Sequence, residues 1–226
     1  AGESQARNKY TYYASKARKD GFEQIAAFFE ETANNEKEHA KLWFKELGGI
    51  GTTAENLKAA VCGETGASAK YAACAAAAKE QGFDQIARLF EATSAAEQIH
   101  IGLEAGVIAE IEPGYERPAA SEAEGIATDL NLIAGALGEI YETSDMYPSF
   151  IKVAQEEGNK KAEFVFTRAK LAEAVHAELY MDAYNNIDAP TDEAYYLCPI
   201  CGYIHKGDDF EKCPICFTPA DKFRKF

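Results

Sequence analysis

Three of the 4 histidines in the sequence follow a glutamate by three residues, in the segments EKEH, EQIH and EAVH. A glutamate and a histidine at this spacing lie on one face of a helix, where both side chains can reach the same cation. A single pair of this kind also arises by chance on a solvated face, but three pairs in one chain indicate metal binding. The pairs are Glu36 with His39, Glu97 with His100, and Glu173 with His176.

Each pair closes one copy of an internal repeat. The copies that begin at Gly2 and Gly63 align without a gap at an offset of 61 residues, and a more divergent copy begins at Gly138. Every copy opens on Gly-Glu, contains a central glycine and ends on Glu-x-x-His. The first glutamate precedes the central glycine by 18, 18 and 19 residues, and that glycine precedes the second glutamate by 15 residues each time.

Both arms of each copy carry apolar residues at three- and four-residue spacing, which predicts two amphipathic helices joined by a tight turn at the glycine. At about 1.5 Å per residue the arms return about 27 Å and about 22 Å from the turn, so the first glutamate and the Glu-x-x-His motif lie at nearly one level. Each hairpin therefore presents half of a metal site. The opening glutamates of hairpins one, two and three are Glu3, Glu64 and Glu139.

Two such hairpins form a four-helix bundle whose carboxylates and imidazoles converge on its axis, an arrangement that holds two metal ions. Carboxylate-rich ligation with imidazole, and a position left open for small ligands, suits iron. Glu142 lies one turn beyond Glu139 and adds a seventh candidate ligand to hairpins two and three. The alternative is three amphipathic hairpins with solvated acids, which gives no reason for acids in register on apolar helices.

Four of the 6 cysteines form two Cys-x-x-Cys pairs separated by eleven residues. This spacing predicts one tetrahedral site of four thiolates in a small C-terminal domain, and such a site accepts iron or zinc. A polar linker that contains proline, NNIDAPTDEAYY, precedes it. Cys62 and Cys74 are expected to be buried free thiols, and His205 a surface residue. The predicted thiolate ligands are Cys198, Cys201, Cys213 and Cys216.

The composition is typical of a globular protein, and 226 residues are enough for one good-sized core and a small appendage. A net charge of −14 argues against nucleic acid or an anionic membrane as a partner. No apolar run approaches the ~18 residues of a membrane span, and no signal peptide is expected. Cysteines in metal-binding spacing indicate a reducing cytoplasm. Because the chain opens in helical pattern without Met or a cap, a truncated N-terminus is expected.

Several segments resemble rubrerythrin, and the similarity covers essentially the whole chain: AGESQARNKYTYYASKA, EQIAAFFEETANNEKEHAK, GEIYETSDMYPSF and the cysteine module. The resemblance implies a ferritin-like di-iron bundle followed by a rubredoxin-like Fe(Cys)4 domain. It also implies reduction of hydrogen peroxide to water, with an electron-donor protein or reductase as a partner. Residues 62–226 match the family's order of ligands by themselves. These ligands are Glu64, Glu97, His100, Glu139, Glu142, Glu173 and His176.

The resemblance further implies roles for single residues. Glu97 and Glu173 would bridge the two metals, and Glu142 and His100 would be alternative ligands of one iron, exchanged as the redox state changes.

Two tyrosines, Tyr71 and Tyr147, correspond to family tyrosines near the iron pair, and plain core packing is the other interpretation. In the first cysteine knuckle Gly202 would let backbone N–H groups approach the sulfurs, whereas the second has Phe217 where the family usually has glycine.

The resemblance does not account for hairpin one, because the chain has one hairpin more than the family pattern requires. Its half site consists of Glu3, Glu36 and His39. Hairpin one either completes a bundle with the same hairpin of a second chain, which predicts a homodimer or higher oligomer, or competes with hairpin two for hairpin three.

We therefore predict an all-α protein: a ferritin-like four-helix bundle with an additional helical hairpin and a small rubredoxin-like domain. The expected parts are the extra hairpin (1–61), the di-iron bundle (62–184), a linker (185–195) and the rubredoxin-like domain (196–226). Two rival functions remain. Ferritin-like iron oxidation and storage uses the same bundle but needs a hollow shell, and a zinc-ribbon interaction module on a helical scaffold needs no catalytic acids.

Overall fold

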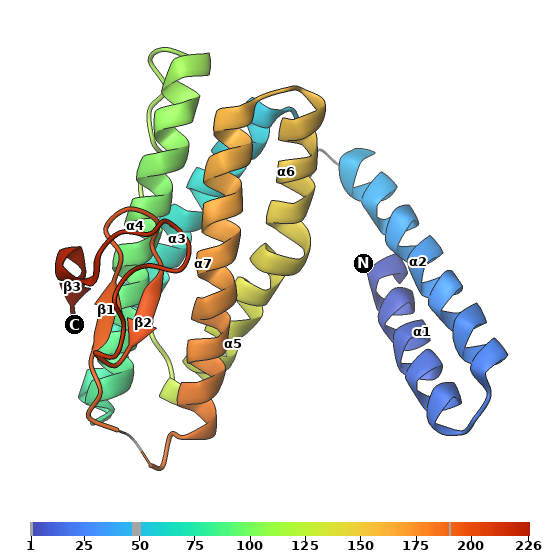
Figure 1. Cartoon of the computed structure of the whole chain (residues 1–226), viewed down its shortest axis with the longest axis horizontal. Helices are drawn as coiled ribbons and strands as arrows, with labels where there is room; N and C mark the ends of the chain where they lie inside the picture. The colour runs from blue at the N-terminus through green and yellow to red at the C-terminus, as the bar shows by residue number, and fades with distance from the viewer. Residues whose placement is uncertain (1, 47–50, 190) are drawn as a thin grey trace. The chain divides into compact units, whose positions relative to one another are not determined.

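A computed structural model of the chain describes residues 2–46, 51–189 and 191–226. The chain forms two compact units, residues 1–51 and residues 52–226. The first is a helical hairpin, drawn in blue in Figure 1, and the second is a helical bundle with a small β-sheet. The predicted fold class, helical with a small C-terminal metal-binding domain, is confirmed.

The first unit consists of α1 (Gly2–Lys19) and α2 (Glu23–Glu46). The turn between them is at Gly21, whose φ of +84° lies in the left-handed region that glycine adopts without a steric cost. Among the side chains that the structure describes in this unit, the buried apolar ones are all alanines: Ala14, Ala17, Ala26 and Ala33.

The helices of the second unit begin earlier than the domain boundary predicted from the sequence. The Thr52 side chain accepts a hydrogen bond from the Glu55 N–H at 3.3 Å, and the Glu55 carboxylate accepts one from the Thr52 N–H at 2.8 Å. This capping box starts a helix at Thr53, so the boundary predicted between residues 61 and 62 lies inside it. The helices are α3 (Thr53–Glu80), α4 (Asp84–Ile111), α5 (Thr128–Tyr141), α6 (Tyr147–Glu156) and α7 (Lys160–Asn185), with a π-helical turn η1 (Glu142–Met146).

The bundle pairs hairpin two, α3 with α4, against hairpin three, α5 and α6 with α7. The first helices of the two hairpins, α3 and α5, lie against each other, and so do α4 and α7. Two apolar clusters fill the interior, one around Phe90 and Tyr180 and the other around Leu57 and Phe166. Along α3, α4 and α7 the predicted ligands fall between the residues of these two clusters. A layer of acids and histidines therefore separates two apolar layers.

The C-terminal domain is a three-stranded antiparallel sheet in the order β2-β1-β3. It lies against the bundle, because Leu197 and Ile204 belong to the apolar cluster around Phe90. Its elements are β1 (Tyr195–Leu197), β2 (Ile204–Lys206), a 3-10 turn η2 (Ala220–Lys222) and β3 (Arg224–Lys225).

The two cysteines outside the C-terminal domain differ in exposure. Cys74 is buried as expected, but the expectation for Cys62 is wrong, since its side chain is exposed. On α3 the neighbouring Val61 and Glu64 face the interior, which turns Cys62 outward at the 100° step of a helix. Within the described ranges, no helix combines the length and apolar character that a bilayer crossing requires.

Candidate metal centres

Six of the seven ligands predicted in the bundle lie together in its interior, each between 0% and 1% exposed. Their ligand atoms form two groups of four, and within each group all atoms lie within 4.8 Å of one another. One group is Glu64, Glu97, His100 and Glu173, and the other is Glu97, Glu139, Glu173 and His176. The two groups share two carboxylates, which suits two cations held side by side with carboxylates between them.

Both imidazoles direct Nδ1 into this cluster. Nδ1 of His100 lies 2.7 Å from Oε1 of Glu173 and 3.1 Å from Oε2 of Glu97. Nδ1 of His176 lies 2.7 Å from Oε2 of Glu173. Glu173 therefore contacts both histidines, one with each carboxylate oxygen.

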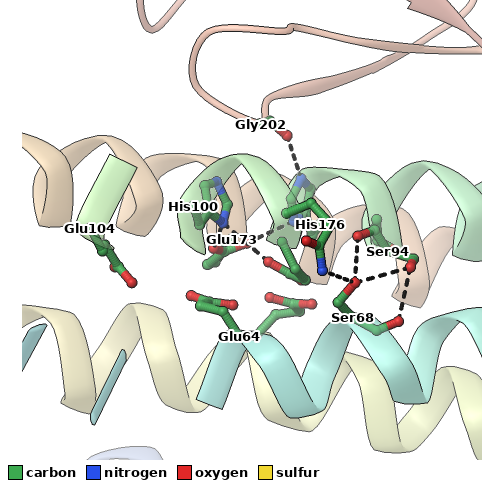
Figure 2. A network of polar contacts seen from close by, with 12 residues as sticks. Glu64, Ser68, Ser94, His100, Glu104, Glu173, His176 and Gly202 are labelled. Atoms are coloured by element: carbon green, nitrogen blue, oxygen red, sulfur yellow. Dashed lines mark hydrogen bonds and ion pairs between the residues drawn. The ribbon is translucent and has the colours of Figure 1, made fainter. Parts of the chain in front are cut away.

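The other ring nitrogen of each histidine faces the cysteine domain. Nε2–H of His176 donates to the backbone carbonyl of Gly202 at 2.9 Å, as Figure 2 shows, and Nε2–H of His100 donates to the carbonyl of Cys201 at 3.1 Å. A hydrogen bond that places the proton on Nε2 leaves the lone pair of Nδ1 free for a cation. Two successive carbonyls of one knuckle thus prepare both histidines as ligands.

Gly202 is required for this contact in a way that the sequence does not indicate. Its φ of +77° is left-handed, and a Cβ at this position would lie closer than 3.0 Å to Nε2 of His100. Real Cβ atoms do not show such separations. The family resemblance implied that Gly202 lets backbone N–H groups approach the sulfurs, and the structure shows that Gly202 lets the knuckle approach a histidine.

Several carboxylate oxygens of the cluster have no hydrogen-bond partner among the described residues. They include Oε2 of Glu64, Oε1 of Glu97 and Oε2 of Glu139. A buried carboxylate oxygen without a partner is costly, and a cation is the group that removes this cost. The cluster is therefore chemically suited to two iron ions.

The two predicted tyrosines hold the outer carboxylates. Tyr71 Oη donates to Oε1 of Glu139 at 2.6 Å, and Tyr147 Oη donates to Glu64. Burial raises the pKa of both phenols well above the usual range, so they stay protonated donors. Core packing alone does not explain hydrogen bonds from both tyrosines to predicted ligands.

Glu142 stands apart from the six gathered ligands. It belongs to neither group of four, is half-buried, and is the first residue of the π-helical turn η1. Burial and the neighbouring Glu173 raise its pKa to about 8. Single π-helical turns occur often at functional sites, and this one begins three residues after Glu139, directly at the end of α5.

Glu104 is a buried acid of this site that the sequence reasoning missed. It is 0% exposed, lies four residues after His100 on α4, and forms a hydrogen bond with the Tyr147 hydroxyl at 3.0 Å. The helical spacing Glu97, His100, Glu104 was an available signal. The repeat hid it, because hairpin one has Trp43 at the equivalent position.

Without metal the cluster contains both charged and neutral side chains. Burial alone would lower the pKa of His100, but the Glu173 carboxylate raises it to about 10. Burial likewise opposes ionisation of Glu173, but His100 and His176 hold its pKa at about 2. Burial raises the pKa of Glu104 from 4.5 to about 8. The metal-free site therefore contains an ion pair between His100 and Glu173 next to protonated acids.

These pKa values predict how the stability of the metal-free protein depends on pH. Between about 4.5 and about 8 the folded protein holds a proton on Glu104 that the unfolded chain releases, so the free energy of unfolding falls as pH rises. Glu104→Gln removes this effect and should make the variant more stable than wild type at pH 9, by an amount on the order of 2–5 kcal/mol. Urea unfolding of both proteins at pH 5 and pH 9 measures the difference. If the free energy of unfolding changes equally between pH 5 and pH 9 in both proteins, Glu104 is not the group that causes the pH dependence.

The cysteine site has the geometry that its spacing predicts. Sγ of Cys198 lies 3.4 Å from Sγ of Cys216, and Sγ of Cys201 lies 3.5 Å from Sγ of Cys213. All four cysteines are free thiols, and their sulfurs lie within 4.8 Å of one another. A tetrahedral ion with metal–sulfur distances of about 2.3 Å places its sulfurs about 3.8 Å apart. The four sulfurs therefore surround one metal position.

Phe217 does not distort the second knuckle. It takes a left-handed φ of +62°, as Gly202 does with +77° in the first knuckle. The closing hydrogen bonds match as well, from Cys198 N–H to the Tyr203 carbonyl and from Cys213 N–H to the Thr218 carbonyl, both at 2.8 Å. The Phe217 side chain is exposed, so the departure from glycine carries backbone strain but no clash.

Hairpin one brings its half site together within its own unit. Ligand atoms of Glu3, Glu36 and His39 lie within 4.8 Å of one another. Nδ1 of His39 is 3.5 Å from Oε2 of Glu36 and 3.9 Å from Oε2 of Glu3. These side chains are partly exposed, in contrast to their counterparts in hairpin two.

Comparison with known families decides the classification. The rubrerythrin family model matches residues 1–54 and, separately, residues 55–184, and the model described as the rubredoxin-like domain of rubrerythrin matches residues 196–224. The chain belongs to the rubrerythrin family. The separate match of residues 1–54 shows that hairpin one is itself rubrerythrin-like.

Individual proteins with similar sequences are named nigerythrin and rubrerythrin. Nigerythrin of Nitratidesulfovibrio vulgaris is 69% identical over 177 residues, which cover 78% of this chain and 88% of that protein. Rubrerythrin of Porphyromonas gingivalis is 44% identical over 229 residues, which cover 99% of this chain and 84% of that protein. A solved structure described as the fully reduced, all-ferrous state of nigerythrin matches with a TM-score of 0.77 over 78% of this chain and 88% of that chain.

Family and geometry together define the two centres. The bundle carries the rubrerythrin di-iron site, and the C-terminal domain carries the rubredoxin-like four-cysteine site.

Proposed function

We propose that this protein reduces hydrogen peroxide to water, with electrons that enter from a donor protein or reductase through the four-cysteine centre. The observation that carries this proposal is the direct contact between the two centres. Both histidines of the di-iron site donate hydrogen bonds to backbone carbonyls of one cysteine knuckle, at 3.1 Å to Cys201 and 2.9 Å to Gly202.

When bound, a pair of ferrous ions would supply the two electrons that break the O–O bond of peroxide. In the proposed assignment Glu97 and Glu173, which belong to both ligand groups, would be ligands of both metal ions. Glu64 with His100 and Glu139 with His176 complete the two ends. Glu142 would exchange with His100 as a ligand at one position when the redox state changes.

Protons come from groups that the fold keeps protonated beside the cluster. Reduction of one peroxide to two waters takes up two electrons and two protons. Glu104, with its pKa raised by burial to about 8, holds a proton at neutral pH and hydrogen-bonds to the Tyr147 hydroxyl. Tyr147 in turn donates to Glu64, which connects Glu104 to a ligand carboxylate. These side chains form a short proton-holding chain at one side of the site.

Electrons reach the cluster through bonded atoms. Cys201 provides one of the four sulfurs, and its own carbonyl accepts the hydrogen bond from His100. The route from thiolate to imidazole therefore consists of covalent bonds and one hydrogen bond. Ferritin-like iron storage needs no electron-delivering domain at the metal ligands, so this contact favours the peroxidase. Free thiols in a metal site fit a reducing compartment, and we propose the cytoplasm.

The experiment that tests this function separates the two centres. Cys198→Ser should abolish the visible absorption of the thiolate–iron centre and stop peroxide turnover with a protein electron donor. Peroxide should still oxidise a chemically reduced bundle in a single turnover, because that reaction needs only the site between α3, α4, α5 and α7. Stopped-flow absorbance after peroxide mixing, with the wild type as control, measures both. Loss of the single turnover as well would contradict the division of roles, and undiminished steady-state turnover would contradict electron entry at the cysteines.

A further inference from the structure

Hairpin one exposes the face that hairpin two buries. At the offset of 61 residues Phe28 corresponds to Leu89, and their exposed fractions are 65% and 0%. Ile25 corresponds to Ile86, with 48% and 4%. In the second unit α4 packs against α7 of hairpin three and against β1 and β2 of the cysteine domain. The equivalent face of hairpin one therefore carries large apolar side chains at positions that are buried in hairpin two.

The core of hairpin one is too small to stabilise it alone. Its buried apolar side chains, among those that the structure describes, are the four alanines Ala14, Ala17, Ala26 and Ala33. A unit of about 50 residues already buries a small fraction of its surface, and alanine contributes little apolar area to such a core. Large side chains such as Trp43 and Tyr13 remain exposed. Burial of this face must come from outside the hairpin.

The three candidate ligands of hairpin one indicate which partner covers its exposed apolar face. Glu3, Glu36 and His39 gather on it at one level, with ligand atoms within 4.8 Å. A di-metal bundle needs one glutamate from each of two helices and Glu-x-x-His from each of two others. A second copy of hairpin one, rotated by a two-fold axis, supplies the missing half at the same level.

We propose that hairpin one pairs with hairpin one of a second chain and that the pair binds two iron ions in a site shared by both chains. The second unit of the same chain provides the template. There α3 lies against α5 and α4 against α7, so first helix meets first helix and the two Glu-x-x-His helices meet each other. The two-fold pair reproduces this arrangement with α1 against α1 and α2 against α2. Its ligand set is two Glu3, two Glu36 and two His39.

Iron per chain in the full-length protein, combined with its mass in solution, tests the proposal. Two irons in the bundle, one in the cysteine site and one from the shared site give about four per chain, against about three without the shared site. Glu36→Ala with His39→Ala should lower the count by about one and leave the chains associated, because the apolar face is intact. The readout is metal content, so it does not depend on whether the bundle reduces peroxide.

A second pair of variants separates association from ligation. Phe28→Glu places a charge on the proposed interface and should lower both the association of chains and the iron count by about one per chain. Tyr12→Glu is the matched control, since Tyr12 is also exposed but its counterpart Ala73 is not fully buried. It should change neither quantity.

Three results would overturn the proposal. The first is about three irons per chain in the wild type. The second is an iron count that Phe28→Glu leaves unchanged. The third is a loss of about two irons per chain in the Glu36→Ala, His39→Ala variant, which would make hairpin one the partner of hairpin three.

Discussion

Gly202→Ala is expected to disconnect the cysteine domain from the di-iron site. A Cβ at residue 202 would lie closer than 3.0 Å to Nε2 of His100, so the knuckle must move away and release the hydrogen bonds to His100 and His176. Alanine in a left-handed conformation adds about 1–2 kcal/mol of strain. Steady-state peroxide turnover should fall by a factor on the order of ten or more, because the two lost hydrogen bonds, at about 1 kcal/mol each, together exceed the roughly 1.4 kcal/mol that corresponds to tenfold.

The matched control for this variant is Gly207→Ala. Gly207 has a φ of +88°, so it carries the same backbone strain, but a Cβ there would meet its nearest atoms at 3.5 Å. Turnover with a protein donor and the reoxidation rate of the reduced thiolate–iron absorption should separate the two variants. If Gly202→Ala and Gly207→Ala behave alike, the knuckle contact is not the route of electron entry.

Glu173→Ala is expected to remove the iron pair while the bundle stays folded. Glu173 belongs to both groups of ligand atoms and lies 2.7 Å from Nδ1 of each histidine. Without it each metal position keeps three donors, and the two imidazoles lose their shared carboxylate. Helical content should survive, because the apolar layers on both sides of the site dominate bundle stability. We expect peroxide turnover to fall at least about a hundredfold, that is by about 2.7 kcal/mol or more.

Glu178→Ala provides the control on the same helix, since Glu178 is exposed. Iron analysis, circular dichroism and peroxide consumption should distinguish the two variants, and Glu97→Ala should resemble Glu173→Ala. Near-wild-type turnover in Glu173→Ala or Glu97→Ala would show that the bridging assignment is incorrect.

The repeat made much of the site predictable. Equal spacing from turn glycine to Glu-x-x-His fixes the level of the ligands on each helix, so six of them could be placed without coordinates. Tyr71 and Tyr147 needed the family resemblance, because a tyrosine at helical spacing is otherwise an ordinary core residue. The start of α3 at Thr53 was missed although its capping box, Thr52 with Glu55, is visible in the sequence.

Other features depend on contacts between distant segments, which spacing does not encode. The hydrogen bond between His100 and Cys201 joins residues 101 positions apart. Glu104 escaped notice because it breaks the repeat, and the π-helical turn at Glu142 leaves no periodic signal within five residues. Cys62 was misplaced because cysteine is usually buried, whereas helical phase decides its direction here.

The contact between the knuckle and the two histidines has a thermodynamic consequence. The carbonyls of Cys201 and Gly202 hold a proton on Nε2 of each histidine, so Nδ1 is the nitrogen left to bind iron. Docking of the domain and binding of iron therefore favour each other, and such a coupling is reciprocal. Whatever strengthens docking raises the affinity of the bundle for iron, and iron in the bundle raises the affinity of the bundle for the domain by the same factor. The two centres are thus parts of one cooperative assembly.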